Sequence, residues 1–427
     1  MIKRFVFMLI AVILVLSTAC TNHAGQPNST GNPAEANNPD KGKAPDPVTV
    51  KLMTYKSMFT EEDFAKYVQN PVKAKYPHIT VELMPINGNI TDMVASGSLP
   101  DLYYLWFASI KPLSELNAVA DLEPLIQKNK FDTNVIEAET LKSMKVMSGL
   151  DKIHVLPIYY NGNALMYNKD IFERFGEKPP VDGMTWEKVR DLGIKISKAD
   201  GNGEYFGFWP DRVFRLSMQV NTPFVNSAGK ANVITDAWRE HFELWKSIYE
   251  PQKLAYGWQD FSKGKIAMCA CSISTIRDAL KNPNLNFDLV TYPEHKTLPG
   301  VSTRPDGIFT GISSVSEKKD AAFLVMQTLL SDEVQTAFTR NGNMSAVNKP
   351  SIRDQFMADI PAMKGKNVKA ITNRKFAVAT YVPSNNDTNA ETIAGDVFAQ
   401  MMKEGQDTNT ALRIANEKVQ ALLDTIK

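Results

Sequence analysis

Aromatic side chains lie next to planar polar ones at two places in this chain of 427 residues. One place is Trp106-Phe107, and the other is the run Phe208-Trp209-Pro210-Asp211-Arg212. A pyranose ring has apolar C–H faces and a rim of hydroxyls, so flat aromatic rings beside Asp or Arg suit its binding. Both places therefore indicate a binding site for a sugar. Trp238 and Trp245, seven residues apart in one predicted helix, are instead expected to pack in the core.

Residues suited to catalysis are few. Beyond residue 48 there are four histidines, and none has the spacing of a metal-binding pair. Neither a GxSxG motif nor a GxxxxGKS/T phosphate loop occurs. Carboxylates are numerous, so a paired general acid and base stays open, although no spacing singles out a pair. We therefore expect a binding protein that is not an enzyme and has no cofactor.

The segment Asp200-Gly201-Asn202-Gly203-Glu204 is similar to the start of a calcium loop. A twelve-residue calcium loop would need Gly at position 205 and Glu at position 211, where Tyr205 and Asp211 stand. Turns formed by Asp-Gly and Asn-Gly explain the segment without a metal. We expect no metal site here.

The first residues predict export. Lys3 and Arg4 precede twelve apolar residues, 5–16, which as a helix span roughly 18 Å, well short of the ~30 Å hydrocarbon core of a membrane. This predicts a signal peptide over 1–19. The following Ser17-Thr18-Ala19-Cys20 resembles a bacterial lipoprotein processing site, which implies cleavage before Cys20 and acylation of its thiol. Ser17 stands where such sites usually have Leu, so plain secretion after an Ala-type cleavage nearby is the alternative.

Residues 20–48 are rich in Asn and Pro and nearly free of large apolar groups, so this segment is predicted to be a disordered tether. A flexible coil of this length reaches roughly 30 Å, enough to hold a domain clear of a membrane. The two cysteines beyond the tether, Cys269 and Cys271, lie two apart in an apolar stretch and are expected to be buried free thiols.

The composition of the whole chain is that of a globular protein, with 43% hydrophobic and 22% charged residues. Its 48 Lys plus Arg against 47 Asp plus Glu argue against broad electrostatic binding of nucleic acid or anionic lipid. Strand and helix patterns alternate from residue 49, which predicts an α/β fold with largely parallel sheets. The predicted strands are 50–55, 79–85, 101–106, 153–160 and 308–315; the longest predicted helices are 60–75, 134–146, 186–197, 234–249, 389–403 and 410–425.

Five fragments in this order resemble the extracellular solute-binding proteins of bacterial ABC importers, in the carbohydrate family that includes maltose-binding protein. They extend over nearly the whole chain beyond the tether, and the block Tyr167-Asn168-Lys169-Asp170 is the most specific of them, although it also marks a strand-to-helix turn that Asn168 can cap. The fragments are 97–106, 164–172, 184–187, 261–268 and the terminal helix after Gly405.

The resemblance implies two α/β lobes, each a mostly parallel sheet flanked by helices, with a ligand cleft between them. Lobe one would comprise 49–157 plus 288–345, and lobe two 158–287 plus 346–427, with hinges near 157, 288 and 346. In open α/β sheets ligands meet the carboxyl ends of strands. Candidate ligand-binding residues at such strand ends are Tyr55, Lys56, Trp106, Phe107, Ser109 and Ser272. Further candidates are Tyr160 and Asn161 at the first crossing, Arg304 and Asp306 near the return crossing, Trp209, Asp211 and Arg212 on lobe two, and Trp258.

The sequence therefore predicts a monomeric receptor, lipid-anchored on the extracellular face of the cell membrane, or on its periplasmic side where the cell has an outer membrane. It would capture a sugar or oligosaccharide by lobe closure and deliver it to the permease subunits of an ABC transporter. Two alternatives stay open: an exported polysaccharide-processing enzyme, and a binding protein for a peptide or another polar solute. A cleft dominated by an acidic or basic cluster would favour a charged solute.

Overall fold

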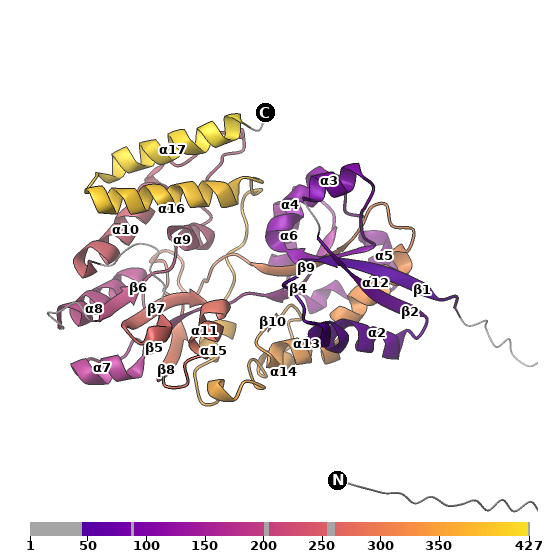
Figure 1. Ribbon diagram of the computed structural model, residues 1–427, viewed down its shortest axis with the longest axis horizontal. Coiled ribbons are helices and arrows are strands. Elements are labelled where there is room, and N and C mark those ends of the chain that lie inside the picture. The colour runs from indigo at the N-terminus through magenta and orange to yellow at the C-terminus, as the bar shows by residue number, and fades with distance from the viewer. Residues whose placement is uncertain (1–44, 87–88, 200–204, 254–260, 426–427) are drawn as a thin grey trace, which may run out of the picture. The chain divides into compact units, whose positions relative to one another are not determined.

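The computed structural model describes residues 45–86, 89–199, 205–253 and 261–425 (Figure 1). The predicted signal peptide, Cys20 and all but the last residues of the predicted tether lie outside these ranges, as do the segment 200–204 and Trp258. Within the described ranges, no helix is both long and apolar enough to cross a membrane.

A six-stranded sheet with the helices packed on it forms what we call the first lobe. The strand order is β10-β4-β9-β3-β1-β2. β1 pairs in parallel with β2 and β3, whereas β9 is antiparallel to both β3 and β4. The strands are β1 (Val48–Thr54), β2 (Ile79–Pro85), β3 (Leu102–Trp106), β4 (Val155–Tyr160), β9 (Gly307–Ile312) and β10 (Met344–Ser345).

The helices of the first lobe come from the early part of the chain and from the segment that follows β9. The predicted helix 60–75 is present as α1, a π-helical turn and α2 in succession, and the hydroxyl of Thr60 accepts a hydrogen bond from the main-chain N–H of Asp63 at its start. The helices are α1 (Glu61–Phe64), α2 (Asn70–Lys75), α3 (Ile90–Ala95), α4 (Ile110–Glu115), α5 (Glu123–Lys128), α6 (Ala138–Ser148), α12 (Lys319–Leu329), α13 (Asp332–Arg340) and α14 (Pro350–Arg353).

A four-stranded sheet forms the second lobe, in the order β6-β7-β5-β8. Asn168 caps α7 as predicted, since its side-chain oxygen accepts hydrogen bonds from the N–H groups of Asp170 and Ile171. The strands are β5 (Asn163–Asn168), β6 (Phe206–Trp209), β7 (Ile266–Ser272) and β8 (Phe287–Thr291). The helices are α7 (Lys169–Phe175), α8 (Trp186–Ala199), α9 (Val213–Val220), α10 (Asp236–Gln252), α11 (Ile273–Ala279), α15 (Lys369–Thr372), α16 (Asp387–Glu404) and α17 (Thr408–Asp424).

Each lobe has its own hydrophobic core. Trp238 and Trp245 are fully buried in the core of the second lobe, as predicted, and Trp245 packs against Trp186 with 5.0 Å between the ring centroids. Cys269 and Cys271 are also buried there as free thiols, which confirms that prediction. The two-lobed α/β fold is therefore confirmed.

The sheets differ from the prediction in one respect, because they are mixed rather than mostly parallel. In the second sheet only β6 and β7 are parallel, and β5 is antiparallel to both of its neighbours. The chain leaves the first sheet along β4 and comes back along β9, so these two strands must run in opposite directions. An alternation of strands and helices in sequence does not reveal such a return.

Three predicted lobe boundaries also differ from the pairing in the structure. The boundary at 157 falls inside β4, which pairs with β9 and so belongs to the first sheet. The boundary at 288 falls inside β8, which pairs with β5 and so belongs to the second sheet. The boundary at 346 falls before Val347 and Ile352, which are buried in the core of the first lobe. The chain therefore crosses later than predicted at all three points, while the division into lobes by residue range stays a prediction.

Candidate functional site

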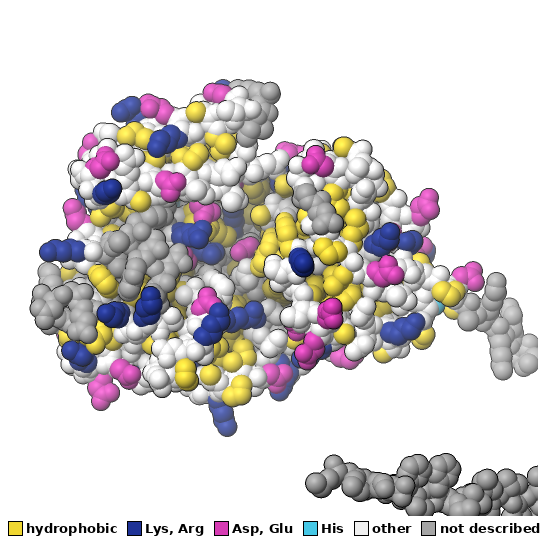
Figure 2. All heavy atoms as spheres, viewed as in Figure 1, with side chains coloured by type: hydrophobic (Ala, Val, Ile, Leu, Met, Phe, Trp, Pro, Cys, Tyr) yellow, Lys and Arg dark blue, Asp and Glu magenta, His cyan; other side chains and the backbone are white. Residues whose placement is uncertain are grey.

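A cavity of about 210 Å³ lies between the two lobes. Figure 2 shows the surface hollowed between the lobes, with basic and acidic side chains close together in the hollow. The first lobe contributes Phe107, Ala108, Lys111 and Met147 to its lining. The remaining lining residues come from α9 and the turn after it, from α16 and from the segments that lead to β9 and α16: Phe214, Arg215, Ser217, Met218, Phe224, Arg304, Pro305, Asp306, Tyr381, Pro383, Ser384, Asn385, Asp387, Thr388 and Glu391.

Ion pairs organise the side of this cavity formed by α9 and α16. Nε of Arg215 lies 3.1 Å from Oδ2 of Asp211, which stands four residues earlier in the chain. Nη1 of Arg212 lies 3.5 Å from Oε1 of Glu391 on α16. Asp211 has a left-handed backbone with φ of 69°, and the indole N–H of Trp245 donates to its carbonyl oxygen at 3.2 Å. The buried tryptophan of α10 therefore holds the turn that places both arginines.

Burial controls the protonation of the carboxylates in this cavity. It raises the pKa of Glu391 to about 7, against the opposing charges of Arg212 and Arg215. It raises the pKa of Asp387 to about 6, against the opposing charge of Arg304. Burial also raises the pKa of Asp211, although Arg215 and Arg212 oppose the shift. Desolvation disfavours a charged carboxylate, and it outweighs the attraction of the arginines here.

The segment that returns the chain to β9 supplies two of the predicted site residues, Arg304 and Asp306. The N–H of Arg304 donates to the carbonyl of Met218 at 3.0 Å, and its guanidinium lies over the ring of Tyr381 at 5.2 Å from the centroid. Oδ2 of Asp306 accepts a hydrogen bond from the side-chain amide of Asn161 at 3.2 Å. The two crossing segments thus hold each other at the cavity.

The other residues predicted at strand ends lie outside the lining of this cavity. The hydroxyls of Tyr55 and Ser109 are 3.2 Å apart, which joins the ends of β1 and β3. Trp106, at the end of β3, keeps 37% of its surface exposed, and Lys56 is exposed as well. The hydroxyl of Ser272, at the end of β7, lies 2.7 Å from that of Ser274. Their roles in binding stay predictions.

Five predicted contact residues are buried in the protein, namely Phe107, Ser109, Tyr160, Trp209 and Asp211, and the cause is plain for two of them. Trp209 is 3% exposed and belongs to the core of the second lobe, because β6 is covered by α8 and α10. Tyr160 is 4% exposed and packs edge-on against Phe107 and Phe376. The structure therefore places Trp209 in the core and not on a cleft wall, and it places Tyr160 behind the cleft.

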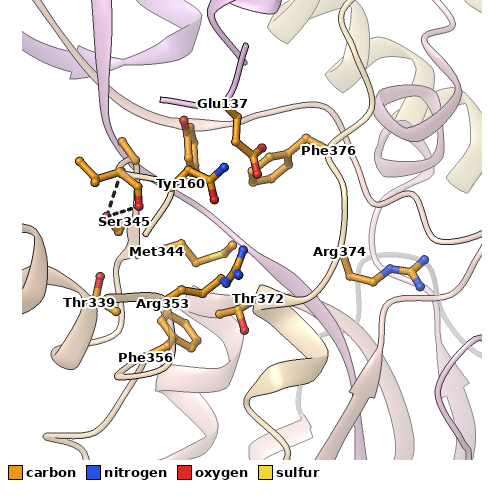
Figure 3. A pocket seen from close by; sticks show the side chains of 13 residues that line it. Glu137, Tyr160, Thr339, Met344, Ser345, Arg353, Phe356, Thr372, Arg374 and Phe376 are labelled. Atoms are coloured by element: carbon orange, nitrogen blue, oxygen red, sulfur yellow. Dashed lines mark hydrogen bonds between the residues drawn. The ribbon is translucent and has the colours of Figure 1, made fainter. Parts of the chain in front are cut away.

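Tyr160 lines a separate small cavity of about 40 Å³ beside the crossing strands. Figure 3 shows Met344 and Arg353 extending toward its centre, whereas Arg374 points away from it. Nη1 of Arg374 pairs with Oε1 of Glu294 at 2.5 Å. A space of this size suits ordered water better than a solute of the size of a sugar.

A third cavity, of about 320 Å³, is lined largely by aromatic side chains, none of which is among the predicted ligand-binding residues. Arg277 of the second lobe donates there from Nη2 to the carbonyl of Asn341 and to Oδ1 of Asn343, both at 3.1 Å. Tyr104 faces this cavity, while Tyr103 donates to the carbonyl of Ala118. The aromatic lining residues are Phe59, Tyr67, Tyr104, Tyr159 and Phe338.

Sequence reasoning missed seven residues of the 210 Å³ cavity that carry a charge or an aromatic ring, namely Lys111, Phe214, Arg215, Phe224, Tyr381, Asp387 and Glu391. Asp387 and Glu391 stand four residues apart, and this spacing puts them on one face of α16. That signal was available in the sequence. Tyr381 follows no strand, so the rule of strand ends could not indicate it.

The described residues hold no cluster of three His, Cys, Asp or Glu side chains that could bind a metal ion. The 210 Å³ cavity offers hydrogen-bonding groups and aromatic rings to a ligand.

Comparison with known proteins gives the family. Residues 60–336 match the bacterial extracellular solute-binding proteins, and the chain belongs to this family, as the resemblance predicted. A binding protein of Brucella abortus is 25% identical over 312 residues, which cover 66% of this chain and 72% of the relative.

Solved structures share the fold. An ABC substrate-binding protein of Listeria monocytogenes in complex with cycloalternan is 18% identical, with a TM-score of 0.71 over 89% of this chain and 100% of that one. A sugar transporter of Rhizobium etli in an open conformation is 19% identical, with a TM-score of 0.72 over 88% and 99%. The sugar-binding protein MalE of Xanthomonas citri is 16% identical, with a TM-score of 0.71 over 89% and 98%.

The raised pKa of Glu391 predicts a pH-dependent stability. Because its folded-state pKa of about 7 lies above the ordinary value of 4.5, the folded protein binds more protons than the unfolded chain between these pH values. The free energy of unfolding should therefore fall as the pH rises through this window. Glu391→Gln removes the titration, so its stability relative to wild type should be greater at pH 8 than at pH 4.5, by about 1–3 kcal/mol.

Urea unfolding without ligand at the two pH values measures this difference. Glu417→Gln is the control, since Glu417 is an exposed carboxylate that pairs with Arg413 on α17. It should show a much smaller difference between the two pH values. Equal behaviour of the two variants would contradict the role of burial at Glu391.

Proposed function

We propose that this chain is a receptor that captures a sugar or oligosaccharide outside the cell and delivers it to the permease of an ABC importer. The observation that carries this proposal is the 210 Å³ cavity, which residues of both lobes line and where aromatic rings lie beside planar charged groups. Phe214 and Tyr381, both partly exposed, supply rings, and Arg304 and Asp306 supply planar hydrogen-bonding groups. This combination suits the two chemical faces of a pyranose.

Relatives with this fold support the choice of ligand. The Listeria protein was solved with cycloalternan, and a further structure of the same fold, 19% identical with a TM-score of 0.68, holds mannotriose. The charged groups of the cavity are of both signs, with Lys111, Arg215 and Arg304 against Asp306, Asp387 and Glu391. Neither an acidic nor a basic cluster dominates, which favours a neutral ligand over a charged peptide.

The mechanism is conformational. Since both lobes line the cavity, a ligand that contacts both of them stabilises the arrangement in which the lobes are closed. The rotation is taken up where the chain crosses between the lobes, after β4, before β9 and after β10. Covalent chemistry is not required, and the energy for transport comes from ATP hydrolysis by the partner transporter.

We further propose that the mature chain is a monomer held at the membrane by a lipid on Cys20, with residues 20–48 as its tether. The signal-peptide pattern and the small residues before Cys20 support this proposal. The polysaccharide-processing enzyme is the rival, and it predicts new reducing ends when the chain is incubated with oligosaccharides. Turnover of this kind would overturn the receptor function.

A sugar panel tests the proposed function. Maltotriose, mannotriose and cycloalternan are added to the purified chain, with a neutral tetrapeptide as the control solute. At least one sugar should raise the melting temperature by several degrees at a hundredfold excess over its dissociation constant, because binding to the folded state adds about 2.7 kcal/mol of stability. Stabilisation by the peptide and by none of the sugars would contradict the proposal.

Two tryptophans at strand ends should behave differently. Trp106→Ala removes a ring that is 37% exposed, so the melting temperature without ligand should change by about 1 °C or less, while the affinity for the sugar that binds falls roughly tenfold. Trp209→Ala removes a ring that is 3% exposed and should lower the free energy of unfolding by about 3–5 kcal/mol. Urea unfolding and calorimetric titration measure the two effects, and a large loss of stability in Trp106→Ala would show that Trp106 is structural.

Attachment to the membrane can be tested separately from ligand binding. Cys20→Ser should move the protein from the membrane fraction to the soluble fraction, because the acyl chains are attached through that thiol. Cys271→Ser is the matched control, since Cys271 is a buried free thiol, and it should leave the protein in the membrane fraction. Persistent attachment of Cys20→Ser, measured by fractionation and immunoblotting, would contradict lipidation.

A further inference from the structure

Two charged side chains in the 210 Å³ cavity each keep one buried atom without a hydrogen-bond partner. They are Nη1 of Arg304 and Oδ1 of Asp387, and neither atom has a partner among the described residues. Nearly all buried polar groups in folded proteins are paired, and leaving one unpaired is costly. Two such atoms in one cavity, one a donor and one an acceptor, therefore point to a ligand that satisfies both.

Both side chains are held in place by their other contacts. The main-chain N–H of Arg304 donates a hydrogen bond to the carbonyl of Met218, and the guanidinium of Arg304 lies over the ring of Tyr381. Oδ2 of Asp387 accepts a hydrogen bond from the N–H of Ser384 at 3.2 Å, and the N–H of Asp387 donates to the carbonyl of Ser384 at 3.1 Å. The free donor and the free acceptor are thus fixed before any ligand arrives.

The other charged groups of the cavity already have partners. Arg215 pairs with Asp211 at 3.1 Å, and Glu391 with Arg212 at 3.5 Å. Nζ of Lys111 lies 3.1 Å from Oε1 of Glu115. Asp306 accepts from the side chain of Asn161. Arg304 and Asp387 are therefore the two charged lining residues that each keep a buried atom without a partner among the described residues.

The chemistry of the two atoms selects the ligand group. A carboxylate would satisfy Arg304 but would meet the negative charge of Asp387, and an ammonium would satisfy Asp387 but would meet Arg304. A hydroxyl accepts a hydrogen bond and donates one, and neighbouring hydroxyls on a pyranose offer both functions side by side. We propose that Arg304 and Asp387, with Tyr381 supporting the guanidinium, form a subsite that recognises neighbouring hydroxyls of a neutral sugar. This inference rests on the proposed function and names the residues that determine specificity.

A double-mutant cycle tests the subsite. The affinities of wild type, Arg304→Met, Asp387→Ala and the double variant are measured by calorimetry with the sugar of the panel (maltotriose, mannotriose or cycloalternan) that binds wild type most tightly. Each single variant should lose at least tenfold in affinity. The double variant should lose little more than either single one, because both residues recognise the same hydroxyls.

Arg413→Met is the matched control, since it removes an exposed arginine that pairs with Glu417 on α17 and is not part of the cavity lining. Its affinity should change less than threefold. Melting temperatures without sugar show whether each variant is folded. Where Asp387→Ala fails to fold, Asp387→Asn keeps the size of the side chain and an acceptor for Ser384, and its affinity should fall severalfold.

The outcomes separate this inference from the proposed function. If wild type binds a panel sugar and both Arg304→Met and Asp387→Ala bind it equally well, the subsite is overturned and the receptor function stands. The same conclusion follows if the losses of affinity in the two single variants multiply in the double variant. Tighter binding of digalacturonate than of any panel sugar would overturn the recognition of neutral hydroxyls. Failure of wild type to bind any of these sugars would overturn the proposed function and the subsite together.

Discussion

The contact between the two crossing segments at the end of β4 and the start of β9 is the constraint on which the site depends. Tyr160 pairs with Gly307, and a Cβ at Gly307 would lie only 2.1 Å from the carbonyl oxygen of Tyr159, so the two backbones touch. The pairing continues beyond the sheet, where the N–H of Asn161 donates to the carbonyl of Asp306 at 2.8 Å. Arg304 and Asp306 therefore reach the cavity because the chain must return beside the strand along which it left.

Much of the first lobe could be predicted from the sequence, because its strands and helices are local patterns. The predicted strand 79–85 matches β2, and the predicted strand 101–106 differs from β3 by one residue. Strand direction could not be predicted in the same way, since β9 owes its antiparallel pairing to a return from the second lobe across a long separation in sequence. The mixed sheets therefore follow from the path of the chain between the lobes, and a local stretch of sequence carries no information about that path.

The residues of the candidate site likewise differ in how far the sequence could predict their positions. Asn161 and Asp306 meet because β4 ends where its antiparallel neighbour β9 begins. Tyr55 and Ser109 are brought together because the carboxyl ends of β1 and β3 share one edge of the sheet. Trp209 also follows that rule in sequence, yet it is buried because α8 and α10 cover β6. Tyr381 and Asp387 come from a segment that follows no strand, so their approach to Arg304 depends on tertiary structure alone.

The balance of charge in the cavity links these residues to the choice of ligand. A cleft that carried unpaired cations alone would attract anions, but here most of the charged groups neutralise one another within the protein through Asp211–Arg215 and Arg212–Glu391. Burial further opposes ionisation of Glu391 and Asp387. The cavity therefore offers a ligand directional hydrogen bonds with little net charge. The near-equal numbers of basic and acidic residues in the whole chain agree with a neutral ligand. Specificity then depends on which hydroxyls can meet one fixed donor and one fixed acceptor at the same time.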